Sequence, residues 1–72
     1  MININYIKGL RAMNGDNQSV VAKALNLSLQ SYNKKENGKV PYTVIELNLL
    51  SEYFEVPIAN FFNQDVDIKS TN

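Results

Sequence analysis

Apolar residues recur along this chain at the spacing of short α-helices, and no stretch alternates between apolar and polar as a half-buried strand does. The spacing predicts a first helix over residues 3–13. The sequence "NGD" at 14–16 should end it, because these residue types tolerate left-handed backbone angles. A second helix is expected from the N-cap Asn17 to Asn26 and a third from the capping Ser28 to Gly38.

The second half of the chain predicts two further helices. Thr43 and Glu46 have the T-x-x-E spacing of a capping box, so a fourth helix should begin there. Pro57 suits the first position of a short fifth helix that ends near Phe62. The residues expected on the inward face of the fourth helix are Val44, Leu47, Leu50, Ser51 and Phe54.

Length and composition restrict the class of protein. Seventy-two residues support one small all-α domain, a compact bundle of about five short helices over residues 1–62, with a flexible tail over 63–72. The chain has no cysteine and no histidine, so we expect no enzyme, no metal site, no cofactor and no small-molecule ligand. Because it has neither a membrane-spanning apolar run nor the pattern of a signal peptide, a cytoplasmic protein is expected.

The charges are unevenly distributed although the net charge is zero. Zero net charge argues against a nucleic-acid partner. However, residues 1–40 contain six basic and two acidic residues (net +4), whereas residues 41–72 contain one basic and five acidic residues (net −4). This asymmetry predicts a basic face toward an anionic partner, with the acidic half turned away. Chance combined with the needs of solubility is the alternative interpretation.

The third expected helix has a polar face suited to DNA. Gln30, Asn33, Lys34 and Asn37 occur at positions i, i+3, i+4 and i+7, while Tyr32 can face the core. Two short helices separated by a few residues form a helix-turn-helix, whose second helix enters the major groove of DNA. The alternative is that these polar side chains form an ordinary solvated surface.

The segment "NQSVVAKALNLSLQSYNKKENGK" resembles the helix-turn-helix of the Xre family, the Cro-like and repressor-like regulators of phages and bacteria. The matching positions are Asn17, Gln18, Val21, Ala22, Leu25, Leu27, Ser28, Gln30, Glu36, Asn37, Gly38 and Lys39, and the likeness extends from about Ile4 to Phe62. The resemblance implies a lambda-repressor-like DNA-binding domain that regulates transcription by occupying an operator in double-stranded DNA.

The resemblance also implies roles for single residues. Gln18 has the family's phosphate-binding position at a helix N-terminus. Gln30 has a base-reading position, from which glutamine can make two hydrogen bonds to adenine. Arg11 and Glu36 match a salt bridge between the first and third helices of many members. Further DNA-binding positions are taken by Ser31, Asn33, Lys34, Asn37 and Lys39.

Four features depart from the family pattern. Leu29 replaces a polar residue at the start of the recognition helix, where it can pack on a thymine methyl group, so we include it among the DNA-binding residues. Lys35 has a position that is usually apolar, and its stem is expected to run along the edge of the core. Asn26 replaces a turn glycine. No basic residue precedes Lys34 in the recognition helix, so guanine reading is expected to be weak.

The sequence therefore predicts a sequence-specific, phage or prophage Cro-like or repressor-like regulator. A domain this small makes few contacts, so a homodimer on a two-fold symmetric operator is expected, with Ile58 and Phe62 as the candidate dimer surface. The alternative is a protein-interaction module of the same fold, an antirepressor or adaptor that binds another regulator through its apolar or acidic half.

Overall fold

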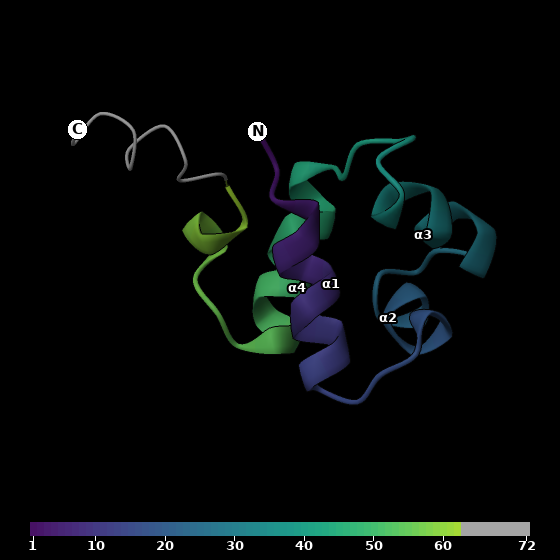
Figure 1. Cartoon of the computed structure of the whole chain (residues 1–72), viewed down its shortest axis with the longest axis horizontal. Coiled ribbons are helices and arrows are strands. Elements are labelled where there is room, and N and C mark those ends of the chain that lie inside the picture. Colours follow the sequence, from purple (N-terminus) through teal and green to yellow (C-terminus); the bar gives the residue numbers. More distant parts are fainter. Residues whose placement is uncertain (63–72) are drawn as a thin grey trace.

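The computed structural model describes residues 1–62, and within them the chain forms four α-helices and one short 3₁₀ helix (Figure 1). In chain order these are α1 (Ile4–Met13), α2 (Gln18–Ala24), α3 (Leu29–Glu36), α4 (Val44–Phe54) and the 3₁₀ helix η1 (Ile58–Phe61). The all-α prediction is confirmed. The fifth helix is a 3₁₀ helix that Pro57 precedes rather than begins. The tail predicted over residues 63–72 lies outside the described residues.

Side chains at the N-termini determine where the α-helices begin. Asn3, Asn17 and Ser28 each accept a hydrogen bond from the backbone N–H three residues further along the chain. Thr43 does the same for α4, and the Glu46 carboxylate in turn accepts a 2.9 Å hydrogen bond from the Thr43 backbone N–H. This reciprocal pair is the predicted capping box.

Residues with left-handed backbone angles end the helices and form the tight turns. Gly15 and Gly38 have φ angles of 74° and 77°, and Asn26 has a φ of 60° at the position where it replaces a turn glycine. Glu55 ends α4 with a φ of 57°. The sequence did not indicate this last residue, because glutamate rarely adopts a positive φ.

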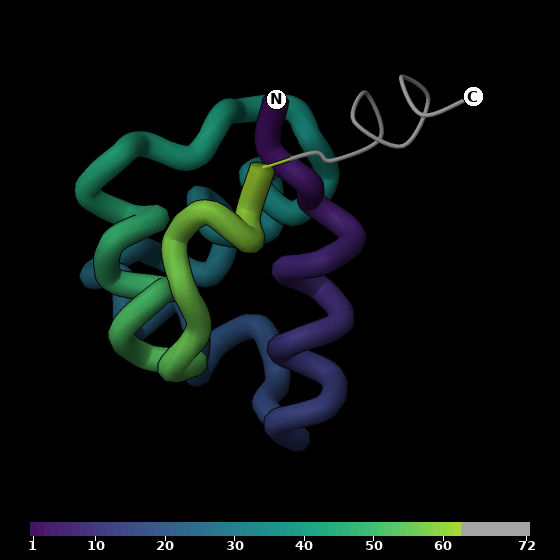
Figure 2. Tube along the Cα trace, turned by 90° about the vertical axis from the view of Figure 1, so that its left-hand side faces the viewer, coloured from purple at the N-terminus to yellow at the C-terminus, as the bar shows by residue number. Residues whose placement is uncertain are grey.

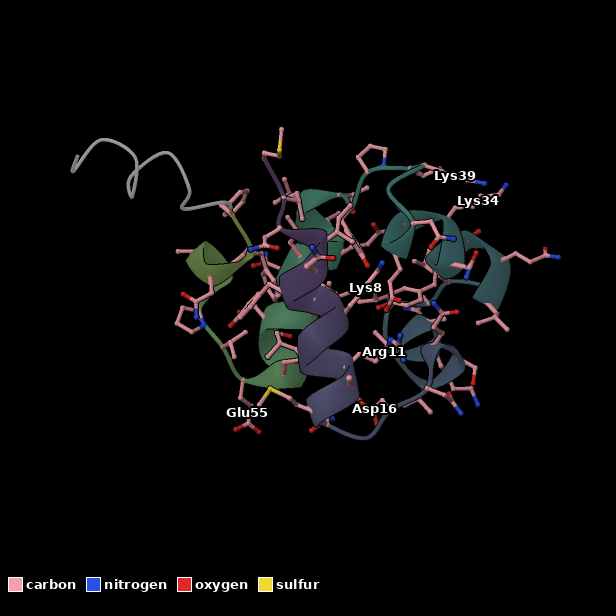
Figure 3. The ribbon with its side chains drawn as sticks, viewed as in Figure 1. Lys8, Arg11, Asp16, Lys34, Lys39 and Glu55 are labelled. Atoms are coloured by element: carbon pink, nitrogen blue, oxygen red, sulfur yellow. The ribbon has the colours of Figure 1, made fainter. Side chains whose placement is uncertain are left out.

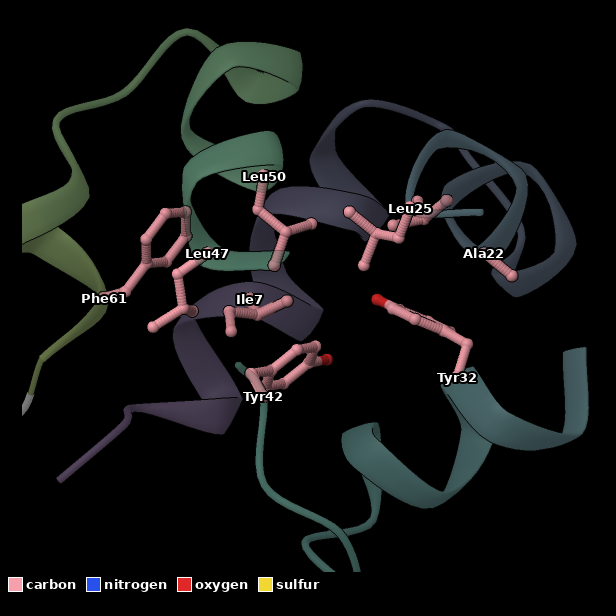
Figure 4. Packing of buried hydrophobic residues seen from close by; sticks show 9 residues of the cluster. Ile7, Ala22, Leu25, Tyr32, Tyr42, Leu47, Leu50 and Phe61 are labelled. Atoms are coloured by element: carbon pink, nitrogen blue, oxygen red, sulfur yellow. The ribbon is translucent and has the colours of Figure 1, made fainter. Parts of the chain in front are cut away.

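The core lies where α1, α4 and η1 meet the pair formed by α2 and α3 (Figure 4). The rings of Tyr32 and Tyr42 pack edge to face with centroids 6.3 Å apart. The predicted core positions Leu47 and Leu50 are confirmed as buried. The complete set of buried apolar residues is Ile7, Val21, Ala22, Leu25, Tyr32, Tyr42, Leu47, Leu50 and Phe61.

The prediction for the first turn of α4 is wrong. Val44 was expected to face inward but its side chain is 72% exposed, and the neighbouring Ile45 is 73% exposed. The buried face of α4 is the one shared by Glu46, Leu47 and Leu50, and Val44 lies at the side of that face rather than on it. Two adjacent apolar side chains are therefore left on the surface.

The residues that precede α1 pair with the end of η1, and the two segments lie side by side in Figure 2. Ile2 and Phe62 form an isolated antiparallel β-bridge, and the Asn3 N–H donates a 2.7 Å hydrogen bond to the Phe61 carbonyl. This pairing holds Phe61 in the core. The helical periodicity of the sequence carried no signal for it.

Candidate nucleic-acid interface

Helices α2 and α3 form a compact unit that exposes one face of α3. Residues 25–28 connect them, and the left-handed Asn26 makes that connection tight. Ala22 and Leu25 on the α2 side are buried, as are Tyr32, Lys35 and Glu36 on the α3 side, and the face of α3 that carries Gln30 and Lys34 is exposed. Figure 1 shows this pair beside the central helices α1 and α4.

A groove of about 550 Å³ borders the outer face of α3. The side chains that line it are Gln18, Leu29, Gln30, Asn33, Lys34 and Lys39. All six are residues that the sequence predicted as DNA-binding positions, and the fold brings them together from α2, α3 and the loop that follows α3. Two other predicted residues, Ser31 and Asn37, are exposed on α3 or at its end but do not line the groove.

The groove combines polar, basic and apolar surface. Gln30 and Lys34 are exposed, and Leu29 is half-exposed (50%). Figure 3 shows Lys34 and Lys39 close together at the top of the view beside α3, while Asp16 and Glu55 lie at its lower edge. The zero net charge of the chain therefore coexists with local positive charge at the groove.

Beneath the groove, the buried carboxylate of Glu36 joins three helices. Glu36 is only 1% exposed, and Arg11 of α1 donates to both of its oxygens, from Nε to Oε2 at 2.6 Å and from Nη2 to Oε1 at 3.2 Å. The Tyr32 hydroxyl donates to Oε2 at 2.6 Å, and Gln18 Nε2 of α2 donates to Oε1 at 2.9 Å. The predicted pairing of Arg11 with Glu36 is present in the structure.

These hydrogen bonds keep Glu36 ionised. Burial alone raises the pKa of its carboxyl group, but the hydrogen bonds from Arg11, Tyr32 and Gln18 outweigh burial and hold the pKa below its ordinary value. The same environment raises the pKa of the Tyr32 phenol, chiefly through burial and secondly through its hydrogen bond to Glu36. Tyr32 therefore remains a hydrogen-bond donor.

Gln18, predicted to bind a phosphate, makes two hydrogen bonds within the protein. Its Nε2 binds Glu36, and its Oε1 accepts a 3.1 Å hydrogen bond from Asn33 Nδ2. Asn33 in turn accepts a 3.0 Å hydrogen bond from Asn37 Nδ2. Both Gln18 and Asn33 are half-buried on the wall of the groove, so part of each amide remains accessible.

The prediction for Lys35 is wrong, because its ammonium group does not reach solvent along the edge of the core. Lys35 is buried, with Nζ 2.8 Å from Glu46 Oε1 and 3.0 Å from the Pro41 carbonyl oxygen. Burial alone raises the pKa of Glu46, but hydrogen bonds from Lys35 and Thr43 hold it below its ordinary value. The unusual lysine at an apolar position was the only sequence signal of this second ion pair.

The two residues of the candidate dimer surface differ in exposure. Ile58 is half-buried and packs against the core, whereas Phe62 is 40% exposed. Of residues 1–62, none lies in a helix with the length and hydropathy needed to cross a membrane. The same part of the chain contains no group of three or more acidic, histidine or cysteine side chains placed to hold a metal ion.

The short α2, the tight turn and the exposed face of α3 define a helix-turn-helix domain. Residues 6–71 match the BetR domain, and the chain belongs to that family. It is also similar to the HTH-type transcriptional regulator PrpR of Mycobacterium tuberculosis, with 40% identity over 63 residues that make up 88% of this chain. The matched segment is 13% of that regulator, so the chain spans a small part of its length. No solved structure matches the chain.

These comparisons confirm the predicted likeness to a helix-turn-helix transcriptional regulator. The family they establish is the BetR domain, and the finer likeness to Cro-like and repressor-like proteins of the Xre family stays a prediction.

Proposed function

We propose that this domain binds double-stranded DNA sequence-specifically and regulates transcription, with α3 as the recognition helix. The observation that carries the proposal is the groove along α3, where two lysines, two glutamines, an asparagine and a leucine from separate segments converge. The similarity to an HTH-type transcriptional regulator supports the same function.

In this proposal α3 lies in the major groove, which is about 12 Å wide and admits one α-helix. The exposed Gln30 amide reads adenine, the Leu29 side chain packs against a thymine methyl, and Lys34 and Lys39 contact phosphates or neighbouring bases. Because the remaining accessible surface of Gln18 lies at the edge of the same groove, it is placed for a backbone phosphate. Ser31 and Asn37 flank these contacts from exposed positions.

The proposed mode of regulation is occupancy of an operator that overlaps a promoter, as in Cro-like and repressor-like regulators. One domain of this size makes few contacts, so we propose a homodimer on a two-fold symmetric site. Exposed apolar side chains that could contribute to it include Val44 and Ile45 on α4 and Phe62. An Ile45→Glu variant should keep its fold, since this side chain is 73% exposed, and should occupy DNA as one chain per site rather than two in sedimentation analysis.

The test of DNA binding is a titration of labelled duplex at stepped salt concentrations. Each neutralised phosphate releases counterions, so the logarithm of affinity should fall linearly with the logarithm of salt concentration. Lys34→Ala should reduce that slope by about one unit, the loss expected for one phosphate contact. Lys23→Ala is the matched control, because Lys23 is an exposed lysine of α2 that does not line the groove.

A second candidate function is a protein-interaction module that binds another regulator. The exposed pair Val44 and Ile45 favours it, because adjacent exposed apolar side chains are typical of protein contact sites. If Lys34→Ala and Lys23→Ala gave the same shallow salt slope, binding through the groove would be contradicted and this second function would be favoured.

A further inference from the structure

A continuous series of side-chain hydrogen bonds leads from the buried Glu36 to the surface of α3. Glu36 Oε1 accepts from Gln18 Nε2 (2.9 Å), Gln18 Oε1 accepts from Asn33 Nδ2 (3.1 Å), and Asn33 Oδ1 accepts from Asn37 Nδ2 (3.0 Å). We call this series the amide relay. It begins at a side chain that is 1% exposed and ends at the exposed Asn37, and two of its members line the groove.

The direction of the amide relay is fixed at its buried end. An ionised carboxylate can only accept hydrogen bonds, whereas a side-chain amide has one donor end and one acceptor end. All the hydrogen bonds to Glu36 described above come from donors on Arg11, Tyr32 and Gln18, as a carboxylate requires. Gln18 must therefore turn its NH₂ group toward Glu36.

The orientation of each amide determines the orientation of the next. With its NH₂ group toward Glu36, Gln18 presents its carbonyl oxygen to Asn33, so Asn33 must present its NH₂ group in return. Asn33 then presents its own carbonyl oxygen to Asn37. Turning over Gln18 or Asn33 would bring two donors face to face at one end of that amide and two acceptors at the other, which costs both of its relay hydrogen bonds.

We propose that Glu36 is a positioning residue for DNA recognition: through the amide relay it fixes where the remaining donors and acceptors of Gln18 and Asn33 point in the groove. Each amide keeps one N–H and one lone pair for a ligand after its relay bonds are made. The hydrogen-bonding groups that Asn33 offers to base edges and Gln18 offers to a phosphate are thus oriented before DNA arrives, and DNA binding need not order these side chains. The consequence for DNA rests on the function proposed above, whereas the relay itself is a property of the free protein.

Glutamine in place of Glu36 would release this constraint. Its side-chain amide can turn either its oxygen or its NH₂ group toward Gln18, so the relay could run in either direction. The variant should therefore lose discrimination between DNA sequences, while the phosphate contacts of Lys34 and Lys39, which are outside the relay, keep the charge-based part of the affinity in place.

The first measurement uses the free protein and needs no DNA. Exchange of side-chain amide protons, followed by NMR, should be about tenfold slower for Gln18 and Asn33 than for the exposed Gln30 amide, the factor expected for one hydrogen bond. In Glu36→Gln this protection should decrease. Equal exchange of Gln18 and Gln30 in the unaltered protein would overturn the relay whatever the protein binds.

The second measurement compares affinity for a selected duplex with affinity for the same duplex carrying one changed base pair. Glu36→Gln should reduce this ratio about tenfold, the value of one good base contact, without changing the salt slope. The matched control is Glu46→Gln, which alters the other buried glutamate but is outside the relay, and it should leave the ratio unchanged.

If Glu36→Gln does not fold, Gln18→Met breaks the first link of the relay without leaving a buried charge unpaired. This variant should reduce the affinity ratio of the two duplexes by the same factor. An unchanged ratio in the folded variant overturns the positioning role. If the Gln18 amide protons exchange slowly but the protein selects no duplex, the relay is present in the free protein. The proposed function and the consequence of the relay for DNA are then both overturned.

Discussion

Lys35 and Glu36 are neighbours on α3, yet they attach this helix to different parts of the molecule. Glu36 faces α1 and α2, where its Oε2 lies 2.6 Å from Arg11 Nε, whereas Lys35 faces α4, where its Nζ lies 2.8 Å from Glu46 Oε1. Glu36, Lys35 and Glu46 are buried, whereas the Arg11 side chain is 20% exposed. From Glu36 the hydrogen bonds continue through Gln18 to the groove, while the other hydrogen bond of Lys35 goes to a backbone carbonyl in the loop before α4.

The two ion pairs therefore have different roles, although each joins α3 to another helix. A buried ion pair adds little net stability, because the cost of removing both charges from water offsets most of their attraction. Removing one partner is costly, since the other charge is then left buried. We therefore expect substitution of one partner in either ion pair to destabilise the fold. Only substitutions in the Arg11–Glu36 pair should also weaken DNA recognition.

The largest effect is expected from Arg11→Met. This change leaves the Glu36 carboxylate buried with only Tyr32 and Gln18 as donors, and should lower the free energy of unfolding by about 3–5 kcal/mol. Urea denaturation followed by circular dichroism measures it. Lys23→Met, an exposed substitution on α2, should change stability by less than about 0.5 kcal/mol. Equal losses of stability in the two variants would contradict the role of Arg11 as the partner of the buried Glu36 carboxylate.

A smaller loss is expected from Lys35→Met. Glu46 would lose its ion pair but keep the hydrogen bond from the Thr43 N–H at the start of α4, so about 1–3 kcal/mol should be lost. The same denaturation experiment on Lys34→Met provides the control, because Lys34 is the exposed neighbour of Lys35. Amide exchange of Gln18 should not change in Lys35→Met, because Lys35 makes no hydrogen bond to the relay. Faster exchange there would show that the two ion pairs are coupled.

Stability should also fall in acid. The pKa values of Glu36 and Glu46 both lie below the ordinary 4.5 in the folded protein, so each carboxyl group binds a proton more readily when unfolded. The contribution of these two carboxylates to the free energy of unfolding is therefore fully present above pH 4.5. It is lost as the pH falls through their pKa values in the folded protein. Unfolding free energies measured from pH 7 to pH 3 should decline less steeply in Glu36→Gln and in Glu46→Gln. An unchanged decline in both would contradict the lowered pKa values.

The smallest effect concerns Leu29 and a single methyl group. Replacing the contacted thymine of a selected duplex by uracil removes the methyl that Leu29 is proposed to cover, which is worth about 0.8 kcal/mol or roughly fourfold in affinity. Leu29→Ala should bind the two duplexes with nearly equal affinity. Fluorescence anisotropy with paired duplexes gives both ratios, and a fourfold preference retained by Leu29→Ala would assign the methyl contact to another residue.

Most features that depend on residues close together in the sequence were predicted correctly. The caps at Asn17, Ser28 and Thr43 and the left-handed Asn26 depend on residues within a few positions of each other, and the structure has all four. Six of the eight residues predicted as DNA-binding positions line one groove, whereas Ser31 and Asn37 do not, and their role in DNA binding stays a prediction. Spacing along one helix grouped Gln30, Asn33 and Lys34, whereas Gln18 of α2 and Lys39 after α3 were added by the family resemblance.

What the sequence missed depends on contacts between distant residues. Lys35 was expected at the edge of the core because its partner Glu46 lies in another helix and already had a local role in the capping box. Val44 fits the helical period of α4, but only the packing of neighbouring elements determines that its side chain is exposed. The amide relay joins side chains 15 and 18 residues apart, which no spacing rule connects.

The most direct test of the central claim is selection of bound duplexes from a random-sequence pool with the unaltered protein and with a Gln30→Ala/Lys34→Ala variant. Since both side chains are exposed on α3, the variant should fold normally. The unaltered protein should enrich a two-fold symmetric motif containing A·T pairs, and the variant should enrich none. A pool that stays random, with weak binding that disappears near physiological salt, would contradict sequence-specific recognition through α3.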